Sequence, residues 1–169
     1  MFRATFPRLC ALLMLLCPDA AHAAPVSASS TGKAVMLKSL SVLKQADLDF
    51  GELVVSGAGT VVMNPVSGSA TTTGAVTPTG APGHPAQFTG TGSKNSVVII
   101  QVPNAPVTLT RVGGTETMTV SNWTLDGPVN RKIPPNSAFN FSVGGTLNIA
   151  AGQVEGTYTG TFAVRVNYP

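Results

Sequence analysis

The chain has 169 residues and a formal net charge of +3, with ten Lys and Arg against seven Asp and Glu. Only 10% of the residues are charged, and Arg131-Lys132 is the only adjacent basic pair. The basic residues therefore do not form the concentrated patch that nucleic-acid binding requires, and we exclude nucleic acid as a partner. The length suits one domain with a substantial core.

The first 23 residues have the three zones of a secretory signal peptide. Arg3 and Arg8 precede an unbroken apolar run, Leu9–Cys17, and Ala21-His22-Ala23 supplies the small–x–small cleavage pattern. A bilayer-spanning helix takes about 20 apolar residues, so this run predicts no membrane span once the signal is cleaved. We expect an exported protein in the periplasm, at the cell surface or outside the cell.

Both cysteines, Cys10 and Cys17, lie in the predicted signal peptide, so the mature chain is expected to be free of disulfides. Acylation of Cys17 as a lipoprotein site is the alternative. Leu16 argues against it, because the residue before such a cysteine is normally small.

The predicted mature chain begins with a leader, residues 24–33, which is rich in Ser, Ala, Thr and Gly and is expected to be flexible. A single domain over residues 34–169 follows. Its short β-branched and aromatic runs, punctuated by Gly, Pro, Asn and Ser, are typical of strands, and no window shows a helical apolar stripe. The expected strands are Val35–Leu43, Phe50–Val55, Thr60–Asn64, Ala86–Gly90, Ser96–Val102, Val107–Arg111, Thr117–Val120, Phe139–Val143, Thr146–Ile149 and Thr157–Tyr168.

Two segments, Phe139–Ile149 and Thr157–Tyr168, alternate apolar and polar residues with little interruption, as strands with one buried face do. Glycines predict hairpin turns at Gly57-Ala58-Gly59 and Gly113-Gly114. Three prolines and two glycines predict a surface loop over Pro78–Pro85. Together the strands and turns predict an all-β, immunoglobulin-like β-sandwich of about nine strands.

Candidate catalytic groups are sparse. The mature chain has one histidine, His84, in a Gly-His-Pro context with no adjacent partner, and it contains no nucleophile elbow. A hydrolytic site would need His84 within reach of Asp126 or Glu155. We therefore predict a non-catalytic protein without a cofactor.

One acidic cluster and one aromatic residue leave alternatives open. Asp47, Asp49 and Glu52 could supply oxygen ligands to calcium, or form a charged turn that discourages edge pairing between sheets. Trp123 could stack on a sugar in a surface binding module or adhesin, or belong to the core. Its neighbours complete an Asn122-Trp123-Thr124 sequon, which we interpret as accidental.

A series of short motifs runs along the mature chain: Ala46-Asp47-Leu48-Asp49-Phe50-Gly51, Gly59-Thr60-Val61, Pro65, Ala86-x-Phe88, Val143-Gly144-Gly145-Thr146-Leu147-x-Ile149 and Gln153-x-x-Gly156-x-Tyr158-x-Gly160-x-x-x-Val164-x-Val166-x-Tyr168. This order of motifs resembles the bacterial domain of unknown function 4402 family, to which no activity is assigned. The resemblance covers essentially the whole mature chain, and its C-terminal motif is the more specific part.

The C-terminal strand is also similar to that of chaperone–usher pilus subunits, which share a penultimate tyrosine, here Tyr168, and a glycine fourteenth from the end, here Gly156. That similarity implies a fimbrial-type subunit whose last strand is held by a periplasmic chaperone and later by like subunits. The candidate strand-exchange edge is Gly156, Tyr158, Phe162, Val164, Val166 and Tyr168.

Two features depart from the pilus pattern. The chain lacks the disulfide that many such subunits carry. Its leader is built mostly of small residues, so the bulkier stretch Val35–Leu43 is either the donated strand or the first strand of the domain itself.

Overall fold

The computed structural model describes residues 27–169, so the predicted signal peptide and the first three residues of the predicted leader lie outside the described residues. The fold below is that of the compact unit Met36–Pro169. Its strands are β1 (Ser41–Ala46), β2 (Asp49–Met63), β3 (Ala70–His84), β4 (Ala86–Thr91), β5 (Val97–Gln101), β6 (Val107–Arg111), β7 (Thr117–Leu125), β8 (Asn130–Lys132), β9 (Ala138–Ile149), β10 (Tyr158–Thr159) and β11 (Arg165–Asn167).

The predicted all-β fold is confirmed. The described residues contain eleven strands and no helix, and every pairing is antiparallel. An eight-stranded sheet and a three-stranded sheet, β11-β5-β8, make a sandwich-like arrangement. The described residues therefore include no helix long and apolar enough to cross a membrane.

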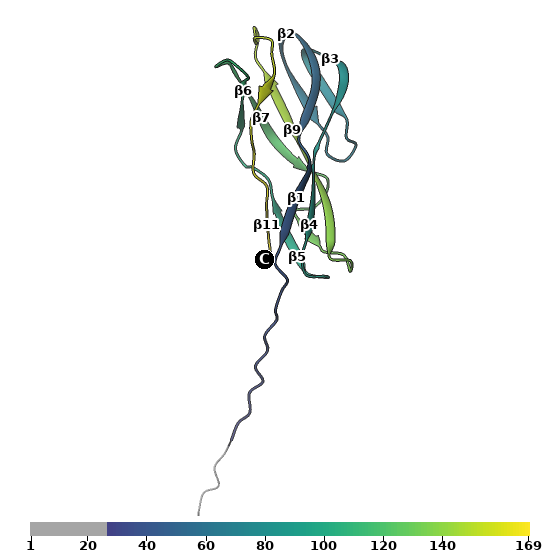
Figure 1. The fold of residues 1–169 in the computed structure, drawn as a ribbon, viewed down its shortest axis with the longest axis vertical. Helices are drawn as coiled ribbons and strands as arrows, with labels where there is room; N and C mark the ends of the chain where they lie inside the picture. The colour runs from purple at the N-terminus through teal and green to yellow at the C-terminus, as the bar shows by residue number, and fades with distance from the viewer. Residues whose placement is uncertain (1–26) are drawn as a thin grey trace, which may run out of the picture. The chain divides into compact units, whose positions relative to one another are not determined.

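Strand β9 is the centre of the larger sheet (Figure 1). Along one edge its first half pairs with β4 and its second half with β2, while β7 pairs on the other edge. Its odd-numbered apolar residues are buried, from Phe139 to Ile149, as the alternation predicts. Sequence analysis divided this strand in two at Gly144-Gly145. The structure shows one strand, in which Gly144 lets Met63 and Pro65 approach closely, because a Cβ on Gly144 would collide with the Met63 carbonyl oxygen.

Strands β2 and β3 form a long ribbon, and here two sequence predictions are wrong. Gly57-Ala58-Gly59 is not a hairpin turn but a break in register inside β2, between Val55 and Gly59. Pro78–Pro85 is not a surface loop, because residues up to His84 pair with β2. Proline is tolerated there because β3 pairs on one side only, and a proline needs no partner for the N–H that it lacks.

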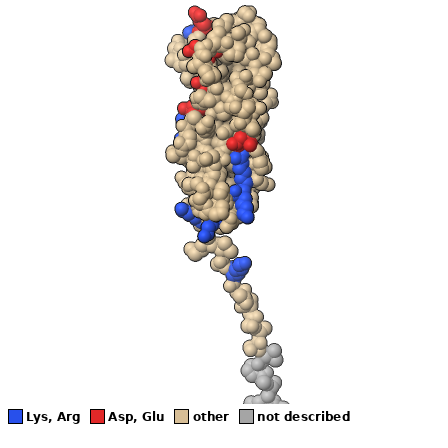
Figure 2. Space-filling model, turned by 90° about the vertical axis from the view of Figure 1, so that its right-hand side faces the viewer, with Lys and Arg blue, Asp and Glu red and all other residues tan. Residues whose placement is uncertain are grey.

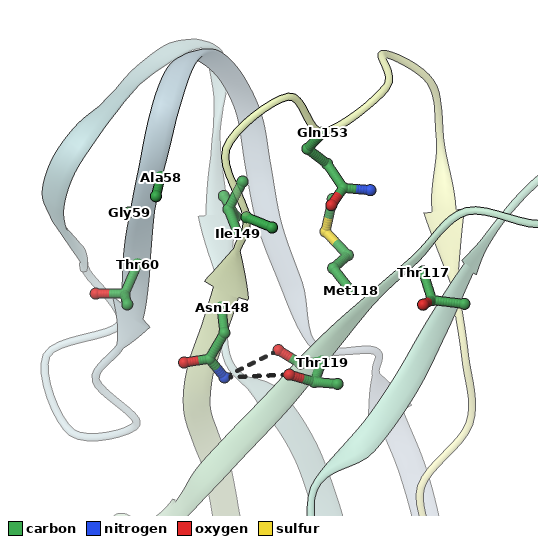
Figure 3. A pocket seen from close by; sticks show the side chains of 10 residues that line it. Ala58, Gly59, Thr60, Thr117, Met118, Thr119, Asn148, Ile149 and Gln153 are labelled. Carbon is green, nitrogen blue, oxygen red and sulfur yellow. Dashed lines mark hydrogen bonds between the residues drawn. The ribbon is translucent and has the colours of Figure 1, made fainter.

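The ribbon bends at the register break, where Figure 3 shows it arching over Ala58. Gly74 has a φ of 73°, and a Cβ on it would collide with the carbonyl oxygen of Ala58. A Cβ on Gly59 would collide with the carbonyl oxygen of Thr73. The two halves of β2, with Leu53 and Val55 in one and Val61 in the other, therefore contact the same core.

Two hydrophobic clusters fill the domain. In the first, Val98 and Ile100 of the small sheet pack against Phe139, Phe141 and Val143 of β9. The second lies between the halves of the bent ribbon and strands β6, β7 and β9, and contains Val61, Val76, Val120, Leu147 and Ile149. Leu48 and Trp123 contact both clusters and so join them into one core.

The C-terminal segment alternates as predicted, with even-numbered residues from Phe162 to Tyr168 half-buried and odd-numbered ones exposed. It is not one continuous strand, however. Thr159 pairs with Thr110 of β6, and Arg165 pairs with Gln101 of β5. The C-terminal segment covers this interval in six residues, whereas the β5–β6 segment opposite it uses nine. The additional residues lie within residues 102–106, where two prolines lack the N–H needed for pairing, so an extended stretch separates β10 from β11.

The expected first strand, Val35–Leu43, is also shorter in the structure. Strand β1 begins at Ser41, and residues 27–40 lie in no strand. Leu40 still packs against the first cluster. Val35, Met36 and Leu37 remain exposed, at 70%, 96% and 48% of their surface.

Candidate binding groove

A groove of about 1110 Å³ opens onto the second hydrophobic cluster. Its floor is apolar and comes from β6, β7, β9 and the C-terminal segment. The floor residues are Val107, Leu109, Met118, Val120, Trp123, Leu147, Ile149 and Phe162. Val120, Leu147 and Ile149 are buried at the bottom of the groove, and the remaining floor residues are half-buried.

One bank of the groove is the first half of β2, Asp49–Val55. This half pairs with β3 along one edge, and β9 joins β2 only from Gly59 onward, so no described strand pairs with its second edge. Phe50, Leu53 and Val55 are half-buried and pack on the second cluster, whereas Val54 points outward and is 56% exposed.

The opposite bank is the C-terminal segment from Gly156 to Phe162. Its short strand β10 pairs with β6, and its other edge has no partner among the described strands. Gly160 allows this segment to lie against β6, because a Cβ there would meet the carbonyl oxygen of Thr108 at 2.6 Å. Phe162 anchors it by packing against Trp123, with ring centroids 4.5 Å apart and the ring planes tilted by 36°.

The two banks leave backbone N–H and C=O groups unpaired on both sides of an apolar floor. Unpaired strand edges accept further strands, and proteins usually block them with proline, charge or a covering element. Pro78 and Pro82 lie in β3, the other strand of the β2–β3 ribbon, whose outer edge is the edge opposite the groove. No proline lies in Asp49–Val55 or Gly156–Phe162, so the groove is an edge that the sequence leaves open.

Acidic side chains surround this groove. Asp49, Glu52 and Glu155 line it, and none of the three forms an ion pair with another described residue. Asp47 lines it too, but its Oδ1 accepts a hydrogen bond from Lys44 Nζ at 2.6 Å. The groove therefore combines an apolar floor with a negatively charged rim.

The predicted calcium ligands do not converge. Asp47 faces Lys44, and Asp49 Oδ1 accepts a hydrogen bond from the Gly51 N–H at 2.8 Å, which shapes the start of β2. Within residues 27–169 no group of three or more His, Cys, Asp and Glu side chains is placed to hold a metal ion. The cluster of acids instead forms part of the groove rim.

Trp123 lies beneath the groove. It is half-buried, contacts both hydrophobic clusters, and its Nε1–H donates a hydrogen bond to the Ala105 carbonyl at 3.2 Å. Phe162 occupies part of its ring surface. The core interpretation of Trp123 accounts for these contacts, and sugar stacking stays a prediction.

The structure does not bring the six predicted strand-exchange residues together in one patch. Gly156, Tyr158 and Phe162 line the groove, whereas Val164, Val166 and Tyr168 pack on the first cluster. The Tyr168 hydroxyl accepts a hydrogen bond from the Ser93 N–H at 2.8 Å and donates one to the Lys38 carbonyl at 2.7 Å. It ties the C-terminus to the chain that precedes β1.

His84 ends β3, is exposed, and its Nδ1 lies 3.4 Å from the Pro85 carbonyl oxygen. It therefore contributes no hydrogen bond to Asp126, which faces Arg131, or to Glu155 at the groove. Catalysis by this histidine stays a hypothesis without support from the described contacts.

A second hollow, of about 580 Å³, lies near the end of β9 (Figure 3). Asn148 lines it, and its Nδ2 donates to the Thr119 carbonyl at 3.2 Å and to the Ser121 hydroxyl at 2.9 Å. These bonds hold β9 to β7 and satisfy the amide within the sheet, so this hollow offers little unmet polar capacity to a ligand.

The β6–β7 turn at one end of the groove floor is held by an ion pair. Arg111 Nε donates to Glu116 Oε2 at 2.7 Å, and this bond lowers the pKa of Glu116 from 4.5 to about 2. Gly113, with a φ of 77°, makes the reversal, so the predicted turn at Gly113-Gly114 is confirmed. The turn keeps Leu109 and Met118 side by side in the groove floor.

Sequence analysis did not identify the first bank, Asp49–Val55, as an open edge. It predicted Phe50–Val55 as a strand. It did not predict that one edge of this strand stays unpaired, because part of the partner strand β3 was interpreted as a loop. The signal available was the difference in proline content between the two strands of the ribbon.

A comparison with protein families matches residues 40–168, nearly the whole described domain, to the family described as Domain of unknown function (DUF4402). The chain belongs to this family. The match confirms the resemblance drawn from the sequence motifs, and its limits coincide with Leu40, where the apolar core begins, and Tyr168, where it ends. Neither the curated proteins nor the solved structures contain a match to this member of DUF4402.

Proposed function

We propose that this DUF4402 protein is an exported, non-catalytic structural component of the cell envelope or surface, a fimbrial-type subunit that joins its neighbours by accepting a β-strand. The observation that carries the proposal is the groove between two unpaired strand edges, Asp49–Val55 and Gly156–Phe162, above an apolar floor.

Strand addition suits this groove for two physical reasons. An inserted strand satisfies backbone N–H and C=O groups on both banks, which supplies affinity without a particular sequence. Each large apolar side chain that it buries on the floor contributes about 1.5–3 kcal/mol. Alternate residues of the inserted strand would face the floor and the solvent, so pockets between floor residues would select its sequence.

A periplasmic chaperone and like subunits are the partners that this proposal implies. Both would use the same groove in turn, since the groove has one apolar floor. The family name assigns no activity, so the support rests on the groove geometry and on the export signal expected at the N-terminus.

The test compares two charged substitutions on neighbouring residues of β2. Leu53→Asp places a carboxylate on the groove side, whereas Val54→Asp places one on the exposed side of the same strand. We expect material sheared from cells to contain filaments or oligomers of the wild-type chain and of Val54→Asp, seen by electron microscopy and size exclusion, and only free subunit of Leu53→Asp.

Because Leu53→Asp could also unfold the domain, hydrogen exchange on the unmodified protein gives an independent readout. Amides of Asp49–Val55 should gain protection on assembly, whereas the β11 amides should not change. Recovery of the wild-type chain from cells only as a free monomer, with those β2 amides unprotected, would overturn the proposed function.

A further inference from the structure

Three lysines that are far apart in the sequence lie together at one end of the domain. The Lys38 N–H donates a hydrogen bond to Ser93 Oγ, and Lys94 directly follows Ser93. The Asn95 N–H donates to the carbonyl of the residue after Lys132 at 2.9 Å, so Lys132 lies beside the same turn. None of the three lines the groove. We call this surface, formed by Lys38, Lys94 and Lys132, the basic end.

The positive charge of the basic end is not neutralised nearby. No Asp or Glu occurs in residues 53–115 or 127–154, and none of the three lysines forms an ion pair with a described residue. Lys44, Arg111 and Arg131, by contrast, each pair with a carboxylate. Figure 2 shows Lys and Arg mainly toward one end of the domain and most Asp and Glu toward the other. The basic end therefore presents a positive potential to whatever approaches it.

Exposed apolar side chains lie next to these lysines. Met36 and Leu37 immediately precede Lys38 and expose 96% and 48% of their surface. Val97 of β5 is 43% exposed and pairs directly with Lys132 of β8. Apolar side chains that are left open to water as a patch mark a contact surface. The partner of this surface must therefore offer both negative charge and an apolar layer.

A bilayer that contains anionic phospholipid offers this combination. Its negative surface potential attracts lysines, and apolar side chains beside those lysines enter the boundary between headgroups and acyl chains. We propose that the basic end docks the chain on an anionic phospholipid bilayer as a peripheral contact, a role separate from strand acceptance by the groove.

The width of the basic end favours a bilayer over the acidic groove of another copy. Its lysines come from three separate segments: the chain before β1, the turn after β4, and β8. The groove has unpaired edges suited to one extended strand, so it cannot receive three segments together. A bilayer presents anionic headgroups over a wide surface, so all three lysines can contact it at once. A soluble polyanion would use the lysines but leave Met36 and Leu37 in water.

The test measures sedimentation of the full chain, purified after export, with lipid vesicles. We expect binding to phosphatidylcholine vesicles that contain about 30% phosphatidylglycerol and none to phosphatidylcholine alone, because only the first carry net negative charge. Raising the salt to about 0.5 M should release most of the bound chain by screening the lysines. Equal binding to the two kinds of vesicle would overturn the proposal.

Paired charge substitutions locate the docking surface. Lys94→Gln with Lys132→Gln should weaken binding to the anionic vesicles at least about tenfold, because both attractions to the headgroups are lost. Lys44→Gln with Arg111→Gln is the matched control, since it changes the net charge equally but removes cations that already form ion pairs. The control should change binding by about twofold or less. Equal losses from the two double variants would overturn the basic end as the docking surface.

Met36→Ser distinguishes a bilayer from a soluble polyanion. It should weaken vesicle binding about threefold or more and leave binding to heparin unchanged, because only the bilayer buries this side chain. Val66→Ser is the control, since Val66 is 75% exposed between β2 and β3, and it should change neither. Vesicle binding that does not respond to Met36→Ser, or heparin binding as tight as vesicle binding, would overturn the bilayer as partner.

Failure of the docking surface and failure of the proposed function give different results. Filaments that form normally from a chain that does not bind anionic vesicles would overturn the docking surface and leave strand acceptance intact. Loss of filaments in Lys94→Gln with Lys132→Gln, without loss of vesicle binding, would show that the basic end contacts another copy, and would overturn the bilayer as its partner.

Discussion

At the scale of single residues, the penultimate Tyr168 has a structural role that its position in the sequence does not reveal. Its ring packs on the first cluster, and its hydroxyl bonds to the Ser93 N–H and the Lys38 carbonyl. A partner that gripped this residue would have to break both bonds. The tyrosine therefore ties Lys38, three residues before β1, to the C-terminal segment.

Tyr168→Phe tests this role, because it keeps the ring and removes the hydroxyl. We expect a loss of about 1–2 kcal/mol in the free energy of unfolding and faster exchange of the Ser93 amide, which loses its acceptor. Tyr158→Phe is the control, since the Tyr158 hydroxyl bonds only to nearby Gln153 and Val154. Equal effects of the two substitutions on Ser93 exchange would contradict the role.

The Arg111–Glu116 pair predicts a pH dependence. The pKa of Glu116 is lowered to about 2 in the folded chain from 4.5, chiefly by its hydrogen bond from Arg111. A lowered carboxylate pKa stabilises the fold above the unfolded value and loses that contribution as pH falls from about 4.5 to about 2. The effect is small because water still reaches the pair, whose side chains expose 27% and 34% of their surface.

The measurement is the difference in melting temperature between the wild-type chain and Glu116→Gln as a function of pH. We expect a constant difference above pH 4.5 that disappears toward pH 2. Adding Arg111→Gln to Glu116→Gln should cause no further pH-dependent loss. A difference that grew at acid pH would contradict the assignment.

At the scale of elements, the bend in the β2–β3 ribbon creates the groove. The bend brings the first half of β2 across the second cluster, which leaves its free edge opposite the C-terminal segment. Gly59 and Gly74 permit it because their backbones lie too close for a Cβ on either residue.

Gly74→Ala should therefore destabilise the domain by about 1–3 kcal/mol, through a positive φ and a collision with the Ala58 carbonyl. Gly113→Ala is a matched control, because Gly113 has a similar φ of 77° and open space where its Cβ would be. Urea unfolding of the two variants measures the difference. Equal losses would mean that close approach at the bend contributes nothing.

At the scale of the whole molecule, two features suit end-to-end assembly. Figure 2 shows Lys and Arg mainly toward one end of the domain and Asp and Glu mainly toward the other, and Asp49, Glu52 and Glu155 line the groove. The Leu53→Asp experiment addresses this scale, since it measures association between copies.

The sequence alone determined the strand content and the family. Period-two alternation is a local property, so Phe139–Ile149 and the C-terminal segment were predictable as strands with one buried face. The motifs from Ala46 to Tyr168 were sufficient to indicate DUF4402. Local composition gave a wrong prediction at Pro78–Pro85. The proline content indicated a loop, whereas residues up to His84 pair with β2.

Only the tertiary structure decided where the groove lies. Whether a strand edge is free depends on which distant segment pairs with it, and Asp49–Val55 loses its second neighbour because β2 bends away from β9 at the Val55–Gly59 break. That outcome is set by contacts between residues far apart in the chain. No pattern within a single strand encodes it.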